Sequence, residues 1–194
     1  MATTNLIAPH TGKDGFVHKA LLRSIGYIEN PEKNNGDLIT SYQCDPRTAA
    51  TEFFLDKRTY RNRTGRENRK DDVIAYHLRQ SFAQGEITPE EANRLGYELA
   101  MRFTKGNHVF VVTTHTDKHH IHNHIIFNAV NLECNRKFKD FHGSKKALAR
   151  LSDLICLENG YSVIEHPQNQ GKKYNRWLGE EYSEEALNAI FKAV

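Results

Sequence analysis

The sequence predicts an α+β fold in which helices pack on the faces of a central, mainly antiparallel sheet. Three observations support this fold class. Segments with helical periodicity alternate with short strand-like segments along the chain. Two runs rich in valine and isoleucine, 108–114 and 121–130, are joined by a short polar segment, which favours a hairpin. The 194 residues, of which 38% are hydrophobic, are enough for one domain with its own core.

Apolar spacing and capping residues predict the first elements. A helix that ends before Pro31 is predicted by the helical spacing of four apolar residues, Leu21, Leu22, Ile25 and Ile28. Residues 38–43 are typical of a short strand. Asp45 is a favourable N-cap and is followed by proline, so a second helix is expected from residue 46 to about Arg63, with Gly65 just beyond it.

The later elements have similar signals. Residues 72–82 favour another strand. A capping box that begins at Thr88 predicts a helix over about 89–105, which Gly106 ends. After the two strands of the hairpin, we expect a helix over 143–158, a brief strand over 161–165 and a helix that begins near Ser183.

Basic residues gather in two segments, although the net charge of the chain is only +3. The segment from Lys57 to Lys70 has seven basic residues and one acid, and the segment from Cys134 to Arg150 has six and one. These local charges of +6 and +5 lie on an otherwise acidic chain. Such clusters favour binding to a polyanion, and solvated helix faces are the alternative.

Cysteine usage and hydropathy exclude several classes of protein. Cys44, Cys134 and Cys156 are odd in number and far apart, which excludes a disulfide framework and a cysteine-based zinc knuckle. No apolar run approaches the length of a membrane span, and no signal peptide opens the sequence. We therefore expect a cytoplasmic protein without membrane insertion.

Histidines are concentrated in the predicted hairpin, where five of the eleven fall between His115 and His124. His122 and His124 are two residues apart on a strand, so their side chains point to one face. His115 closes the preceding strand and can share that face. Three neutral imidazoles in such a triangle bind a divalent metal and leave coordination positions open, as a catalytic site needs. Exposed histidines beside a turn are the alternative.

Neighbouring polar residues extend this candidate site. Asp117 can orient a ligand imidazole or contact the metal itself. His119 and His120 lie in the turn and are less suitable ligands. Asn128 shares the face of His124 and is a candidate to bond to substrate or to a ligand. The chain has no Gly-rich phosphate loop and no His-Glu-x-x-His helix, which disfavours a zincin protease. A metal ion that lies between two basic clusters is suited to polarise a phosphodiester.

The sequence resembles a known family over most of residues 18–166. HTDKHHIHNHIIFN resembles the third motif of mobilisation relaxases in the HUH endonuclease superfamily, most closely the MobP-type relaxase domains of plasmids and integrative conjugative elements. Three further segments resemble other parts of these domains: KALLRSIGYIENPEK, YHLRQSFAQGEITPEEANRLGYELAMRF and FKDFHGSKKALARLSDLICLENGYSVIE. The first of these resembles the N-terminal tyrosine motif.

This resemblance implies an HUH relaxase-like fold and a single relaxase domain over 1–194. Such a domain is compatible with the N-terminal part of a longer protein. It implies metal-assisted nicking of single-stranded DNA at a transfer origin through a reversible 5′-phosphotyrosyl intermediate, for conjugative transfer. Tyr27 matches the nucleophile, His122 and His124 the metal-binding pair, and His115 the third ligand. Only one tyrosine lies in the tyrosine motif. Tyr27 also lies about 160° from the centre of the apolar stripe of its helix, off the buried face.

The resemblance also implies cofactors and partners. Mg²⁺ or Mn²⁺ is the expected metal, and imidazole ligands also suit Zn²⁺ or Ni²⁺. Accessory relaxosome proteins and a coupling protein are expected beside the DNA. Asp117, a turn histidine and the metal itself are the candidates to help deprotonate Tyr27, and the sequence does not decide among them. The candidate DNA contacts are Arg61, Arg63, Arg66, His77, Arg79, Phe82, Asn128, Lys137, Lys139, Lys145 and Lys146.

Alternatives remain open at the level of sequence. Phe82 would stack on a base, or else pack in the core. A rolling-circle replication initiator of the same superfamily would share the chemistry. A metal-containing nucleic-acid-binding module would not cleave, and a hydrolase of small phosphate esters would need neither Tyr27 nor a basic track.

Overall fold

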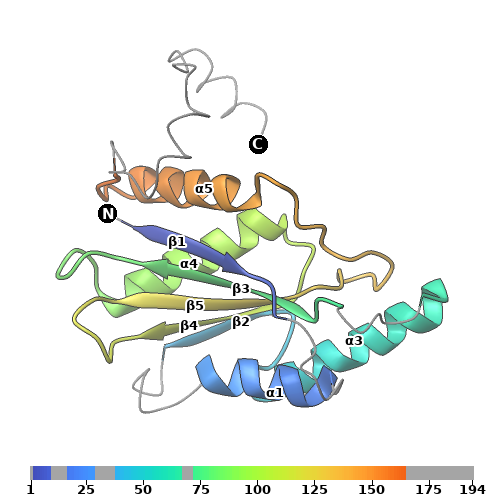
Figure 1. Ribbon diagram of the computed structural model, residues 1–194. Coiled ribbons are helices and arrows are strands. Elements are labelled where there is room, and N and C mark those ends of the chain that lie inside the picture. Colours follow the sequence, from blue (N-terminus) through green and yellow to red (C-terminus); the bar gives the residue numbers. More distant parts are fainter. Residues whose placement is uncertain (1, 10–16, 29–37, 67–71, 165–194) are drawn as a thin grey trace. The chain divides into compact units, whose positions relative to one another are not determined.

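One antiparallel sheet organises the chain (Figure 1). The structure is a computed structural model that describes residues 2–9, 17–28, 38–66 and 72–164. Its five strands have the spatial order β1-β3-β5-β4-β2, and every neighbouring pair is antiparallel. The strands are β1 (Thr3–Ile7), β2 (Ile39–Tyr42), β3 (Ala75–Ser81), β4 (Phe110–His115) and β5 (His122–Asn128). The predicted α+β class and the central hairpin of β4 and β5 are confirmed.

Helices cover both faces of this sheet (Figure 1). They are α1 (Val17–Ile28), α3 (Ala49–Thr64), α4 (Pro89–Thr104) and α5 (Ser144–Glu158). Helices α1 and α3 pack on one face, and α4 and α5 pack on the other. All described elements belong to one unit that ends at Val163. A single domain over 1–194 stays a prediction, and the expected helix near Ser183 lies outside the described residues.

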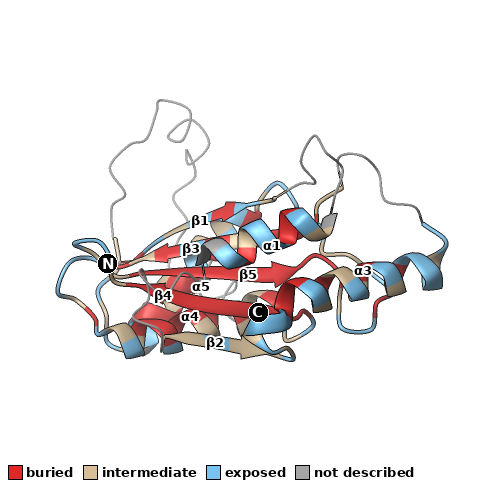
Figure 2. Cartoon of the chain, turned by 90° about the horizontal axis from the view of Figure 1, so that it is seen from below, coloured by how far each residue is buried: buried red, intermediate tan, exposed pale blue. Residues whose placement is uncertain are grey.

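Each face of the sheet has its own hydrophobic core. Between the sheet and α4 and α5 lie Leu78, Leu95, Leu99, Phe110, Ile125, Phe127, Leu148 and Ile155. On the opposite face lie Leu21, Ile25, Phe53, Val111 and Ile126. Burial on both faces explains why the apolar residues of β4 and β5 follow one another without alternation, at 110–112 and 125–127, and Figure 2 shows both strands buried along their length. The two central strands therefore form a rigid base for the residues at their ends.

Local capping signals set the helix ends much as predicted. The Thr88 side chain accepts a hydrogen bond from the backbone of Glu91, as the capping box requires. Gly65 ends α3 in the left-handed region at φ 66°. The predicted second helix differs at its start, because a 3-10 turn, η1 (Pro46–Thr48), precedes α3. Asp45 caps this turn by accepting from the backbone N–H of Arg47.

One predicted strand is absent, and one observed strand was missed. Residues 161–164 are not a strand, because the chain turns after α5 and the backbone N–H of Tyr161 bonds to the carbonyl of Cys156. Strand β1 was not predicted. It is an edge strand with polar residues, and only Leu6 of its five residues is buried. Among the described residues, no helix is long and apolar enough to cross a membrane.

Candidate metal centre

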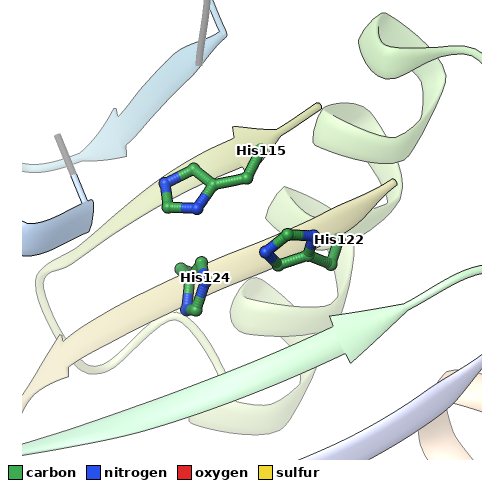
Figure 3. Close-up of side chains that lie close together, drawn as sticks. All are labelled: His115, His122 and His124. Carbon is green, nitrogen blue, oxygen red and sulfur yellow. The ribbon is translucent and has the colours of Figure 1, made fainter. Parts of the chain in front are cut away.

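Three histidines converge at one end of the β4–β5 hairpin (Figure 3). His115 ends β4, and His122, which begins β5, lies directly opposite it in the strand register. His124 follows two residues later on the same face of β5. One ligand nitrogen from each ring lies within 4.8 Å of the others. The structure thus brings together the three residues expected to hold a metal.

This cluster lies on the face of the sheet that α1 and α3 cover. His124 and Ile126 alternate with Ile125 along β5, and Ile126 belongs to the core beneath α1 and α3. The three imidazoles are 1%, 5% and 4% exposed for His115, His122 and His124. The C-terminal end of α1 and the β4–β5 turn lie toward the same end of the strands (Figure 1). Tyr27 belongs to the last turn of α1, and its side chain lies outside the described part of the structure.

Burial keeps the imidazoles of His122 and His124 neutral. Burial lowers the pKa of His122, and the Asp117 carboxylate partly opposes this shift. Burial and the neighbouring imidazoles lower the pKa of His124 to about 2. A neutral imidazole has the free lone pair that a metal ion needs. Near pH 7 these two rings therefore offer nitrogen ligands without having to release protons first.

A buried hydroxyl lies beside the cluster on the same face of the sheet. Thr113 lies directly opposite His124 in the register of β4 and β5, on the same face. Its Oγ1 atom is buried and has no hydrogen-bond partner among the described residues. Such a hydroxyl costs free energy unless something bonds to it. Three imidazoles and this hydroxyl together suit a divalent cation that also holds an oxyanion.

A fourth histidine touches the cluster. The Nε2 atom of His77, on β3, lies 2.8 Å from the Nδ1 atom of His124. Burial, and then the charge of Arg79, lower the pKa of His77 to about 4. His77 was expected to contact DNA, but its Nε2 atom is engaged with His124 instead. The period-2 alternation placed His77 and Arg79 on one face, but only the register of β3 against β5 shows which residue His77 meets.

Two other residues that were expected to contact DNA are buried. Phe82 is 3% exposed in the core beneath α4 and α5, so it is not available to stack on a base. Asn128 is fully buried at the other end of β5. Its Nδ2 atom donates to Asp56 at 2.8 Å, and its Oδ1 atom accepts from the backbone of Val130 at 3.1 Å. Phe82 thus packs in the core, the alternative that the sequence left open, and the burial of Asn128 leaves it no exposed surface for a DNA contact.

The remaining acidic candidate lies beside the cluster and outside it. Asp117 is exposed in the turn after β4 and is not one of the three grouped ligands. Its influence on the pKa of His122 places its charge near the site. Arg79 is exposed and lies directly opposite His124 in the register of β3 and β5. Its side chain therefore lies on the same face of the sheet as the imidazoles.

The two basic segments meet in space at a surface hollow at the other end of the sheet. Arg66, just after α3, lines this hollow with Arg136, Lys137 and Lys139 of the loop after β5. Tyr60 also lines it, and the Lys137 ammonium lies 5.0 Å from the centre of its ring. We call these five residues the basic hollow. Arg61 and Arg63 are exposed on the last turns of α3, where Arg63 donates to the carbonyl of Glu133.

Some basic residues do not belong to a single surface. Lys57 is 1% exposed and pairs with Asp72 at 3.0 Å, so it supports the fold rather than a binding face. Lys137 pairs with the same carboxylate at 2.6 Å. Lys145 and Lys146 lie in the first turn of α5, which packs on the opposite face of the sheet from α3. The two basic segments of the sequence therefore do not form one continuous basic surface.

Comparisons with known proteins show a family and several relatives that this chain resembles. The family model described as "Relaxase: MobA/VirD2-like, nuclease domain" matches residues 27–161. "Protein rlx" from Staphylococcus aureus is 36% identical over 147 residues, which are 76% of this chain and 43% of that protein. "Group II intron-interrupted relaxase LtrB" from Lactococcus lactis subsp. cremoris (strain MG1363) is 31% identical over 191 residues, 90% of this chain and 34% of that protein.

The chain thus spans 43% and 34% of the length of these two relatives. A solved structure described as "Molecular Basis of Vancomycin Resistance Transfer in Staphylococcus aureus" is 14% identical, with a TM-score of 0.49 over 84% of this chain and 96% of that chain. The family assignment therefore rests on the family model and the sequence relatives. Because the family model matches most of the chain, from Tyr27 through all three converging histidines, the chain belongs to the relaxase family, as a nuclease domain of the MobA/VirD2-like type.

Proposed function

We propose that this chain is a single nuclease domain that nicks one strand of DNA at a transfer origin, for conjugative transfer. The observation that supports this most strongly is the convergence of His115, His122 and His124 within the range that the relaxase model matches. Imidazole triads with open positions are typical of catalytic metal sites, whereas structural zinc sites are usually closed by four ligands with cysteine. No described cysteine belongs to the grouped ligands.

The three histidines would hold a divalent cation, Mg²⁺ or Mn²⁺, although Zn²⁺ and Ni²⁺ also suit imidazole. When bound, such an ion polarises the scissile phosphate and offsets the charge that develops on it. Tyr27 gives up its phenolic proton, with Asp117 as the proposed acceptor, and its oxygen forms a bond to phosphorus. The bond to the 3′-oxygen breaks, and that oxygen takes up a proton. One phosphodiester replaces another, so the 5′-phosphotyrosyl link can be reversed to rejoin the strand.

Two surfaces are proposed to bind single-stranded DNA. Arg79 lies opposite His124 in the strand register, which supports a contact with a phosphate beside the metal. The basic hollow, together with Arg61 and Arg63, would bind the backbone farther along the strand. Tyr60 in this hollow offers a ring on which a base can stack. Lys145 and Lys146 stay candidates for a separate contact.

Cellular context follows from the family and from cysteine chemistry. Accessory relaxosome proteins and a coupling protein are the proposed partners, because transfer requires that the nicked strand be delivered. We place the protein in the cytoplasm, where its free cysteines, two of them buried, remain thiols.

The test is covalent capture with Mn²⁺ and a labelled pool of single-stranded oligonucleotides of randomised sequence. Wild-type protein should form an adduct that survives a denaturing gel, and peptide mapping should place the nucleotide on Tyr27. Tyr27→Phe should form no adduct but still bind Mn²⁺, since only one oxygen is removed. Tyr161→Phe, after α5, is the matched control and should form the adduct normally.

Each other outcome contradicts a specific part of the proposal. An adduct on another residue would reject Tyr27 as the nucleophile. Cutting without an adduct would indicate a hydrolase that activates water. Binding without cutting would indicate a nucleic-acid-binding module.

A further inference from the structure

His77 contacts a proposed metal ligand from a different strand. It pairs with Ile126 in the register of β3 and β5, which makes His124 its diagonal neighbour on the same face. The ring centres of His77 and His124 are 5.0 Å apart, and the two facing nitrogens, Nε2 and Nδ1, are 2.8 Å apart. This distance is that of a normal hydrogen bond.

A hydrogen bond between two neutral imidazoles needs one donor and one acceptor. If Nδ1 of His124 donates, then Nε2 of His124 has the lone pair that a cation can bind. His77 then accepts at Nε2 and holds its own proton on Nδ1. The opposite arrangement would put the proton of His124 on Nε2 and leave no nitrogen of that ring free for an ion. Because Nδ1 of His124 faces His77, only Nε2 can bind an ion, and it can do so only in the first arrangement.

His122 is oriented in the same sense by a different partner. Its Nδ1 atom lies 3.4 Å from the carbonyl oxygen of His120. A carbonyl can only accept, so Nδ1 of His122 donates and Nε2 is left for an ion. Two of the three grouped rings thus have Nδ1 engaged by the protein. Outer partners of this kind commonly orient metal-bound imidazoles.

We propose that His77 is a positioning residue that holds His124 as the Nδ1–H tautomer and aims its Nε2 atom at the bound cation. This inference rests on the proposed metal-dependent function. His77 is not itself one of the grouped ligands among the described residues, and its Nε2 atom is occupied by His124. The sheet supports it on both sides, because β3 lies between β1 and β5.

The first experiment measures Mn²⁺ binding by calorimetry with the metal alone. His77→Phe retains a ring but accepts no hydrogen bond, and Mn²⁺ affinity should fall about tenfold to a hundredfold. His77→Gln has an amide oxygen that can accept from His124, and it should recover most of this loss. His142→Phe, at an exposed histidine before α5, is the matched control and should bind Mn²⁺ as wild type does. Equal affinity of His77→Phe and wild type would overturn the proposal.

The second experiment reads the tautomer in the wild-type protein without metal, and so does not depend on any variant folding. Two-bond ¹H–¹⁵N correlation spectra distinguish a proton on Nδ1 from one on Nε2. His124 should have its proton on Nδ1, and a proton on Nε2 would overturn the proposal. Wild-type protein that binds no Mn²⁺ would contradict the proposed metal-dependent function, while the spectra would still decide the role of His77.

Discussion

Gly96 of α4 lies directly against the side chain of Asn123 in β5, so that a Cβ atom at Gly96 would be 2.5 Å from Nδ2 of Asn123. Asn123 stands between His122 and His124 and points to the opposite face of the sheet. Its Nδ2 atom donates to the carbonyl of Ala92 at 2.6 Å and to Gln80 at 3.0 Å. The α4 backbone therefore approaches the sheet immediately behind the metal centre.

Gly96→Ala should destabilise the protein by about 1–3 kcal/mol, because the methyl group must displace Asn123 or α4 from a packed interior. The measurement is urea unfolding followed by circular dichroism. Gly26→Ala in α1 is the matched control, since nothing lies within 4 Å of a Cβ there. It should stabilise the helix by about 0.5–1 kcal/mol. Unchanged stability of Gly96→Ala would show that this contact is not tight.

His122→Ala or His124→Ala should abolish Mn²⁺-dependent nicking, because each removes one of three nitrogen ligands. Thermal unfolding without metal should show that either variant is still folded. His119→Ala is the control, since His119 is exposed in the β4–β5 turn and is not one of the grouped ligands. A loss in His119→Ala as severe as in His122→Ala would mean that His115 is the wrong third ligand.

Asp72→Ala should destabilise the protein by about 3–5 kcal/mol, because it leaves the buried Lys57 ammonium without its ion-pair partner. Burial already lowers the pKa of Lys57, and Asp72 opposes this shift. Lys57→Met should cost much less, since it removes the buried charge itself and Lys137 still pairs with Asp72. Urea unfolding of both variants gives the comparison. Equal losses would contradict this account of the pair.

Replacing Arg61 and Arg66 together with glutamine should reduce the salt dependence of binding to single-stranded DNA. Each neutralised phosphate contributes about 0.7 to the slope of log affinity against log salt, so the slope should fall by about 1.4. Arg94 and Arg102 on α4 form the matched control, because both are paired with glutamates. Their double replacement should leave the slope as it is. An unchanged slope in the first variant would make the end of α3 a solvated face.

Acidification from about pH 7 toward pH 5 should lower the free energy of unfolding of the metal-free protein. Burial lowers the pKa of His108, and hydrogen bonds to the carbonyls of Asn128 and Val130 only partly oppose this. The unfolded chain, with a histidine pKa of about 6.5, then binds more protons than the folded chain as the pH falls through this range. Urea unfolding with a chelator at several pH values measures the slope. His108→Gln should flatten it, and an equal slope would contradict the assignment.

Local chemistry in the sequence was sufficient for much of this fold. The capping residues Asp45 and Thr88 and the breaker Gly65 act on backbone groups within a few residues, so the start of η1, the start of α4 and the end of α3 follow from them. The short polar segment between two β-branched runs predicted the hairpin. The period of two placed His122 and His124 on one face. These features involve neighbours in the chain, and sequence spacing describes such neighbours directly.

Pairing between distant strands was decided only by the tertiary structure. Alternation shows which residues share a face of β3, but it does not show that β3 lies beside β5, so the contact of His77 with His124 could not be derived. The burial of Phe82 and Asn128 likewise depends on helices that cover both faces. Strand β1 has too few apolar residues to be recognised alone and exists because β3 offers it a hydrogen-bonding edge. Register and burial arise from contacts between segments far apart in the chain, and for that reason local patterns do not determine them.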